Sequence, residues 1–147
     1  MSRYTHRAVA LSAAGICYLI LGVSVARAGN TPPTISKAFN PTSISSGGAS
    51  TITFTLTNSV AIPLTSGSFS DTLANMAISG AQAAGGTCVG AGSNIFANNA
   101  TALAFSGITI PASGNCTVTV VVTSSTVGAN PNTTSRLLRN YFAVAVS

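Results

Sequence analysis

Lys37, Asn58 and Asp71 are the residues whose types could carry out a chemical step in this sequence. A lysine amine can attack the side-chain carboxamide of an asparagine, and a carboxyl group held beside both can move the protons. The product would be an amide cross-link between two parts of the chain. Simpler roles also fit: Lys37 could extend to solvent from a strand edge, Asn58 could close a strand end, and Asp71 could cap a helical turn.

Few other residues could take part in chemistry. The chain has 147 residues with Lys+Arg 6, Asp+Glu 1 and His 1, and charged residues make up 5% of it, against about 25% in typical soluble domains. The first 28 residues hold Arg3, His6, Arg7 and Arg27. Beyond them the charged residues are Lys37, Asp71, Arg136 and Arg139, with a net charge of +2.

This inventory argues against several function classes. Acid–base catalysis needs a positioned pair of titratable groups, and metal sites need clusters of His, Cys or carboxylates. Nucleic-acid binding needs a basic stripe that displaces counterions. Three scattered cations do not provide one, so we expect no enzyme activity, no cofactor, no metal site and no nucleic-acid partner.

Residues 1–28 have the pattern of a helical secretory signal peptide. A basic start is followed by the apolar run from Ala8 to Ala26, and Ala26-Arg27-Ala28 places small residues where signal peptidase reads them. Cleavage after Ala28 would leave a chain that begins at Gly29 and has no stable membrane insertion. The alternative is an uncleaved anchor, because the apolar run is near the lower length limit for a membrane span. The prediction is an exported protein, extracellular or at the cell surface, or in a periplasm.

Two cysteines, Cys88 and Cys116, remain after such a cleavage, because Cys17 leaves with the signal segment. An even pair in an exported chain indicates a disulfide, and two free buried thiols are the alternative. Closing the loop between Cys88 and Cys116 would stabilise the fold by roughly 3 kcal/mol, because the cross-link reduces the conformational entropy of the unfolded chain.

Residues 29–147 have the pattern of short β-strands separated by turns. The clearest alternation of apolar and polar residues covers Ser50–Asn58 and Asn115–Ser124. Weaker strands are expected at Thr34–Phe39, Gly67–Thr72, Ile95–Ala97, Ala100–Phe105 and Tyr141–Val146, and a short helical turn at Leu73–Ile78. The prediction is one antiparallel all-β sandwich of about seven strands.

Several separated segments resemble a family of bacterial surface repeats. They include PTISKAFNPTSISSGGASTITFTLTN (Pro33–Asn58), Phe69–Leu73, Gly86–Cys88 and Ile110–Val118. In this order they resemble the DUF11-like group of repeat domains, in its DUF7933-type branch, over residues 33–135. The resemblance implies an immunoglobulin-like β-sandwich, usually found in tandem in exported or cell-surface proteins, without catalytic activity. Lys37, Asn58 and Asp71 all lie in stretches that fit it.

Residues 136–147 depart from that pattern, with two arginines close together before an apolar end. They fit either a short final strand or the truncated end of a longer, multi-repeat protein. An incomplete last strand would leave an edge that could accept a strand from another copy.

The expected function is therefore that of a structural module: a spacer, surface-layer or fibre subunit whose partners are copies of itself or other surface proteins. The alternative is an adhesin-type module that recognises a glycan or a neighbouring surface, for which the threonines of Ser50–Asn58 could form a regular binding face. Asn132-Thr133-Thr134 is one of three matches to the N-glycosylation pattern, and chance matches are expected in a chain this rich in Asn, Ser and Thr.

Overall fold

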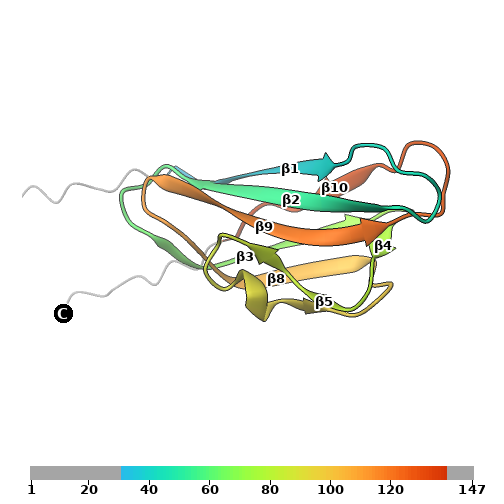
Figure 1. The fold of residues 1–147 in the computed structure, drawn as a ribbon. Helices are drawn as coiled ribbons and strands as arrows, with labels where there is room; N and C mark the ends of the chain where they lie inside the picture. Colours follow the sequence, from blue (N-terminus) through green and yellow to red (C-terminus); the bar gives the residue numbers. More distant parts are fainter. Residues whose placement is uncertain (1–30, 139–147) are drawn as a thin grey trace, which may run out of the picture.

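The computed structural model describes residues 31–138, which form an antiparallel β-sandwich (Figure 1). The first sheet has the order β1 (Thr34–Asn40), β2 (Ala49–Asn58), β9 (Gly114–Thr123) and β4 (Ala77–Ile78), and β6 (Gly85–Gly86) also pairs with β9. The second has the order β10 (Asn132–Thr134), β3 (Leu64–Leu73) and β8 (Ala102–Ile110). A small third sheet pairs β5 (Gln82–Ala83) with β7 (Ile95–Phe96), and the 3-10 helix η1 (Ala91–Ser93) lies between them in the chain. The predicted fold class, an all-β sandwich, is confirmed.

Two predicted features lie outside the described residues. They are the signal segment with its cleavage residues Ala26, Ala28 and Gly29, and the strand expected at Tyr141–Val146. Within residues 31–138, no helix is long and apolar enough to cross a membrane.

The alternation seen in the sequence builds the centre of the first sheet. In β2, Ile52, Phe54 and Leu56 are fully buried, and the threonines between them are half-buried on the opposite face. In the neighbouring β9, Val118 lies beside Phe54 and Cys116 lies beside Leu56. Since successive side chains of a strand point to opposite faces, these two strands place one apolar face against the second sheet.

Four phenylalanines fill the space between the sheets. Phe69 of β3 and Phe105 of β8 stack with ring centroids 4.4 Å apart, and Phe54 of β2 meets both rings at 5.2 and 5.4 Å. Phe96 of β7 lies edge-on to Phe105 at 5.1 Å. Aromatic pairs in such geometries are worth about 0.5–1.5 kcal/mol beyond their buried area. The core therefore joins strands from all three sheets.

The structure corrects two predictions about the elements. Within residues 31–138 it has ten strands rather than about seven, because the chain between β3 and β8 forms four two-residue pieces, β4 to β7. The helical turn expected at Leu73–Ile78 is wrong. Leu73 ends β3, Asn75 adopts a left-handed backbone with φ 57°, and Ile78 in β4 is fully buried beside Val122 of β9. Asparagine tolerates that conformation well, which permits a tight turn instead of a helix.

Gly86 allows one of these short pieces to lie directly against β9. It has φ 112°, and a Cβ atom there would lie 2.2 Å from the carbonyl oxygen of Thr117. The amides of Thr87 and Cys88 both donate to that same carbonyl, at 2.9 and 3.0 Å. Only glycine fits this approach without displacing backbone, so Gly86 sets the position from which Cys88 reaches β9.

The two ends of the described chain lie at the same end of the sandwich (Figure 1). Residues 32–35 and 136–138 line one shallow surface hollow together. The first and the last residues of the described chain thus lie close to each other.

Candidate functional site

The candidate site lies between the two sheets and is built on Lys37 of β1. Ile35, Lys37 and Phe39 are the partly buried residues of this strand, and the residues between them are exposed. Lys37 is paired with Phe54 of β2 in the register, so its side chain leaves the same face as the core residues of the first sheet. Its side chain is 14% exposed. The strand therefore directs a lysine, instead of a hydrophobic side chain, toward the second sheet.

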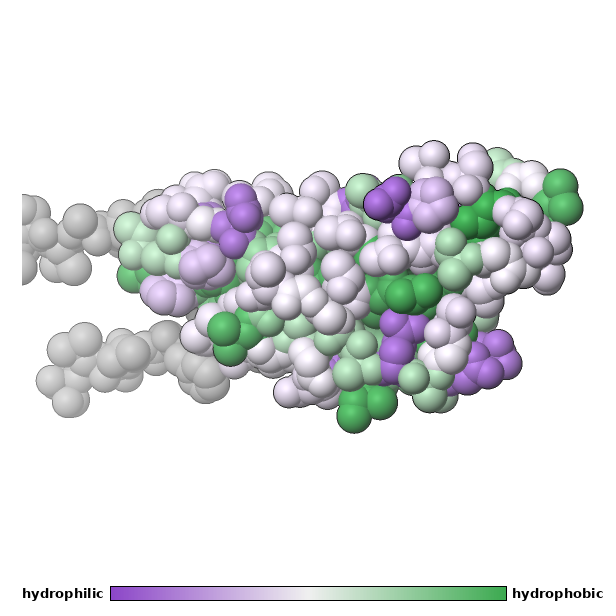
Figure 2. All heavy atoms as spheres, viewed as in Figure 1, coloured by the Kyte–Doolittle hydropathy of each residue, from purple (hydrophilic) through white to green (hydrophobic). Residues whose placement is uncertain are grey.

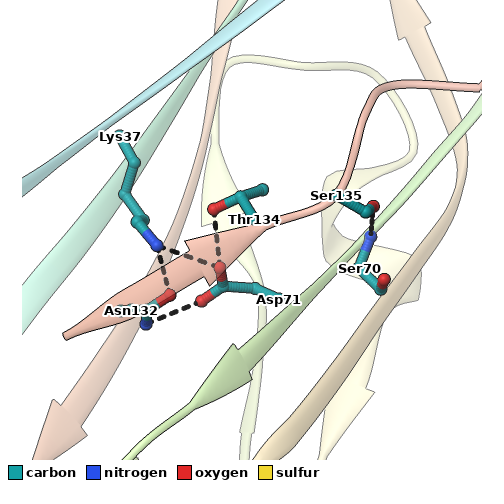
Figure 3. A network of polar contacts seen from close by, with 6 residues as sticks. All are labelled: Lys37, Ser70, Asp71, Asn132, Thr134 and Ser135. Atoms are coloured by element: carbon teal, nitrogen blue, oxygen red, sulfur yellow. Dashed lines mark hydrogen bonds and ion pairs between the residues drawn. The ribbon is translucent and has the colours of Figure 1, made fainter.

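Asp71 occupies a core position in the second sheet. It is the inward-facing residue of β3 between Phe69 and Leu73, and its side chain is 0% exposed. An unpaired carboxylate at such a position would be very costly. Lys37 Nζ donates to Asp71 Oδ1 at 3.0 Å, which pairs the two opposite charges across the sandwich (Figure 3).

The last described strand supplies the other members of the site. In the β10–β3 register, Thr134 lies opposite Asp71 and Asn132 lies opposite Leu73. Thr134 Oγ1 donates to Asp71 Oδ1 at 2.6 Å, and Asn132 Nδ2 donates to Asp71 Oδ2 at 2.9 Å. Lys37 Nζ also donates to Asn132 Oδ1. Lys37, Asp71, Asn132 and Thr134 are called the inter-sheet cluster below.

The charges of the cluster fix the orientation of the Asn132 amide. Its oxygen faces the lysine Nζ and its NH2 group faces the carboxylate (Figure 3). Turning the amide around would set NH2 against a cationic donor and oxygen against an acceptor. The carboxamide is thus held between the amine and the acid with its carbonyl toward the amine.

Backbone pairing beyond β10 keeps the cluster in place. Ser70 N donates to Ser135 Oγ at 2.8 Å (Figure 3), and Ser135 N donates to Ser70 O at 2.8 Å. Leu138 then forms a further bridge with Ser68. The chain is therefore hydrogen-bonded to β3 on both sides of Asp71.

Of the three residues singled out in the sequence, the structure brings two together. Asn58 lies at the end of β2, and its Nδ2 donates to the carbonyls of Ile62 and Pro111 at 2.8 and 3.0 Å. Its Oδ1 accepts from the amide of Val60 at 2.9 Å. These bonds agree with the simpler role of closing a strand end. Asp71 caps no helix, because its neighbours belong to a strand.

Replacing Asn58 by alanine is expected to lower the free energy of unfolding by about 2 kcal/mol, because it removes three hydrogen bonds and leaves the buried amide of Val60 without its partner. Chemical denaturation checks this. The matched control is Asn115→Ala, an exposed asparagine on β9, for which a change within about 0.5 kcal/mol is expected. Equal effects of the two variants would show that the Asn58 bonds do not hold this loop.

The disulfide predicted between the two cysteines is present in the structure. Cys88, just after β6, is bonded to Cys116 of β9, with Cα atoms 4.9 Å apart and a sequence separation of 28. Both residues are buried members of the hydrophobic core. The bridge ties the irregular segment between β3 and β8 to the first sheet.

The outer face of the first sheet carries a regular array of hydroxyl groups, called the threonine face below. It is formed by residues at neighbouring register positions of three strands: Ser36 of β1, Thr51, Thr53, Thr55 and Thr57 of β2, and Thr117 and Thr119 of β9. The β2 threonines are half-buried among their neighbours.

A surface groove of about 530 Å³ also lies between residues 41–46 and 126–130, and its lining contains no charged side chain.

Asn132 and Thr134 were not predicted as site residues. Their strand has three residues, which is too short for an alternation pattern to be recognised. The one available signal was Asp71 itself, because a buried carboxylate requires donors, but sequence cannot say which strand supplies them. Within residues 31–138, no group of three or more His, Cys, Asp or Glu residues is arranged to hold a metal ion.

Comparison with known proteins places this architecture in a family. A search of curated proteins finds no match. Residues 33–142 match the family described as a domain of unknown function, DUF7933. That range includes the whole of the sandwich from β1 to β10, with every member of the inter-sheet cluster and both bridged cysteines, and it extends beyond the Ser135 boundary suggested by the sequence. The chain belongs to the DUF7933 family.

Proposed function

We propose that the protein is an exported, non-catalytic structural module of the cell surface, serving as a spacer, surface-layer or fibre subunit. The observation that carries the proposal is the use of Lys37 and Asp71, two of the few ionisable groups of the chain. Lys37 and Asp71 point toward each other between the sheets, at 14% and 0% side-chain exposure, and are hydrogen-bonded to the last described strand. Groups that could meet a substrate or ligand in solution are instead used to join strands.

The surface supports the same role. The face in Figure 2 is largely pale, in the range typical of Gly, Ser and Thr, with only scattered strongly hydrophilic or hydrophobic patches. The signal-peptide pattern and the buried disulfide fit an oxidising, extracellular environment. Sheet edges such as β1 and β8 carry few of the charges that usually prevent strand addition. Association between copies is therefore the favoured way for the module to work.

The second candidate function is binding of a glycan or a neighbouring surface, and the threonine face is the observation that favours it. A flat array of hydroxyl groups could match a repeating surface. Sugar sites, however, usually present aromatic rings for stacking, and the phenylalanines of residues 31–138 are buried except for Phe39, which is half-buried. The structural role is therefore placed first.

Sedimentation velocity and electron microscopy of the purified protein over a range of concentrations test the proposal. The expected result is ordered assemblies that grow with concentration, together with antibody labelling on the outside of intact producing cells. A protein that stays monomeric and binds defined glycans on an array would contradict the structural role and favour the second candidate.

A further inference from the structure

We propose that the inter-sheet cluster is a self-modification site, at which Lys37 Nζ and the Asn132 side chain form an intramolecular amide bond with release of ammonia. Whether this bond forms does not depend on the structural role proposed above for the module. The inference that the bond resists tension between the two ends of the module does rest on that role.

The contacts supply a nucleophile and an electrophile side by side. Lys37 Nζ contacts Asn132 Oδ1, and the carbonyl carbon Cγ lies one C=O bond, about 1.2 Å, beyond that oxygen. The two residues are 95 positions apart in the chain but are held by opposite sheets at this point. Such a fixed approach replaces a bimolecular encounter, which is a large part of the barrier to amide exchange in water.

Asp71 is placed to move both protons that the reaction requires. Its Oδ1 is 3.0 Å from Lys37 Nζ, and its Oδ2 is 2.9 Å from Asn132 Nδ2, the nitrogen that must leave. Thr134 Oγ1 donates to Oδ1 at 2.6 Å and fixes the plane of the carboxyl group. One carboxyl group therefore touches the attacking nitrogen with one oxygen and the leaving nitrogen with the other.

The atoms balance without any other reactant. The Lys37 ammonium first gives one proton to the Asp71 carboxylate, and the free electron pair on Nζ then adds to Cγ of Asn132 while the C=O pair moves to Oδ1. Asp71 passes its proton to Nδ2 and takes one from Nζ. The Cγ–Nδ2 bond breaks as the carbonyl re-forms, ammonia leaves, and Asp71 ends as a neutral acid.

Burial favours this reaction over hydrolysis. The Asp71 side chain is 0% exposed, that of Lys37 is 14% exposed, and Asn132 is half-buried, so the reacting groups are largely shielded from water. The reaction also removes a pair of opposite charges whose desolvation is costly. The product leaves no charge on Lys37 and a single buried acid that can donate a hydrogen bond to the new carbonyl.

The bond would connect the first strand to the last described strand. β1 belongs to the first sheet and β10 to the second, and the chain enters and leaves the sandwich at the same end. Tension on the two ends would peel these strands away from the sheets. A bond between Lys37 and Asn132 would carry that load directly between them and protect residues 38–131.

Intact mass spectrometry of the reduced, unfolded protein tests the proposal. The wild type is expected to be lighter than its sequence by one ammonia, and Lys37→Arg is expected to have its full sequence mass. Arginine keeps the positive charge beside Asp71 but removes the amine nucleophile. Comparing the two proteins cancels any shared processing of the N-terminus. Asp71→Asn, which keeps both reacting groups and removes the proton carrier, is also expected to show the full mass.

Two matched variants locate the reacting asparagine. Asn58→Ala and Asn115→Ala are expected to retain the loss of ammonia, while Asn132→Ala is expected to abolish it. A full-mass wild type would overturn the proposal. So would an ammonia loss that persists in Lys37→Arg, because an asparagine that cyclises alone loses the same group. Should a variant fail to fold, a protease digest of the wild type still decides, since only the amide bond gives a branched peptide containing Lys37 and Asn132.

Discussion

Replacing Asp71 by alanine is expected to lower the free energy of unfolding by about 3 kcal/mol or more. Removing one partner of a buried pair leaves the other charge uncompensated, at a cost of about 3–5 kcal/mol. The Thr134 hydroxyl and the Asn132 amide also lose their acceptor. Loss of the proposed amide bond between Lys37 and Asn132 would lower the free energy of unfolding further. Denaturant unfolding followed by circular dichroism measures the effect.

A double variant shows whether the destabilisation of Asp71→Ala comes from the uncompensated charge or from lost packing. In Lys37→Met combined with Asp71→Leu, both charges are replaced by apolar side chains of similar volume, a change that is often neutral or stabilising at buried ion pairs. The double variant is therefore expected to be more stable than Asp71→Ala alone. An Asp71→Ala protein within about 1 kcal/mol of the wild type would contradict the importance of the cluster for stability, since ordinary surface substitutions lie within about 0.5 kcal/mol.

Removing the disulfide is the second change with a large expected effect. Cys88→Ala combined with Cys116→Ala is expected to destabilise the protein by about 3 kcal/mol, because the unfolded chain regains the freedom of a long loop. The segment from β4 to β7 should loosen first, since it has only two-residue strands to hold it. Unfolding in guanidinium chloride and hydrogen exchange of that segment measure the two effects.

Reductant provides the control for this prediction. It should lower the unfolding midpoint of the wild type and leave that of the double alanine variant unchanged. Both sulfurs are buried, with residue exposures of 6% and 4%, so reduction is expected to require opening of the fold. A wild-type midpoint that does not respond to reductant even after complete unfolding and refolding would contradict a stabilising role.

The strands at the centre of the first sheet could be predicted from sequence because their environment is regular. Each has neighbours on both sides, one face in the core and one face outward, so burial alternates without a break from Thr51 to Thr57 and from Cys116 to Thr123, and only Val121 departs from the apolar–polar alternation. The Cys88–Cys116 pair could likewise be predicted, because these are the two cysteines that follow residue 28 in the sequence.

The rest depended on interactions that sequence does not contain. Leu73–Ile78 has an apolar spacing that also suits a helix, and burial of Ile78 beside β9 decided in favour of a strand. Lys37 and Asp71 stood out because charge is so scarce. Their partner could not be inferred, since it depends on the register of a three-residue strand with β3. Asn58 and Asn132 are both asparagines near strand ends, and only the fold distinguishes their roles.

The scarce reactive groups of this chain join its strands, and in the proposed reaction they ultimately bond Lys37 to Asn132. Tandem mass spectrometry of a reduced protease digest of the wild-type protein tests it most directly. A branched peptide, with the Lys37 side chain linked to Asn132 and one ammonia lost, is the predicted result. Linear peptides alone, with Lys37 and Asn132 both unmodified, would contradict it.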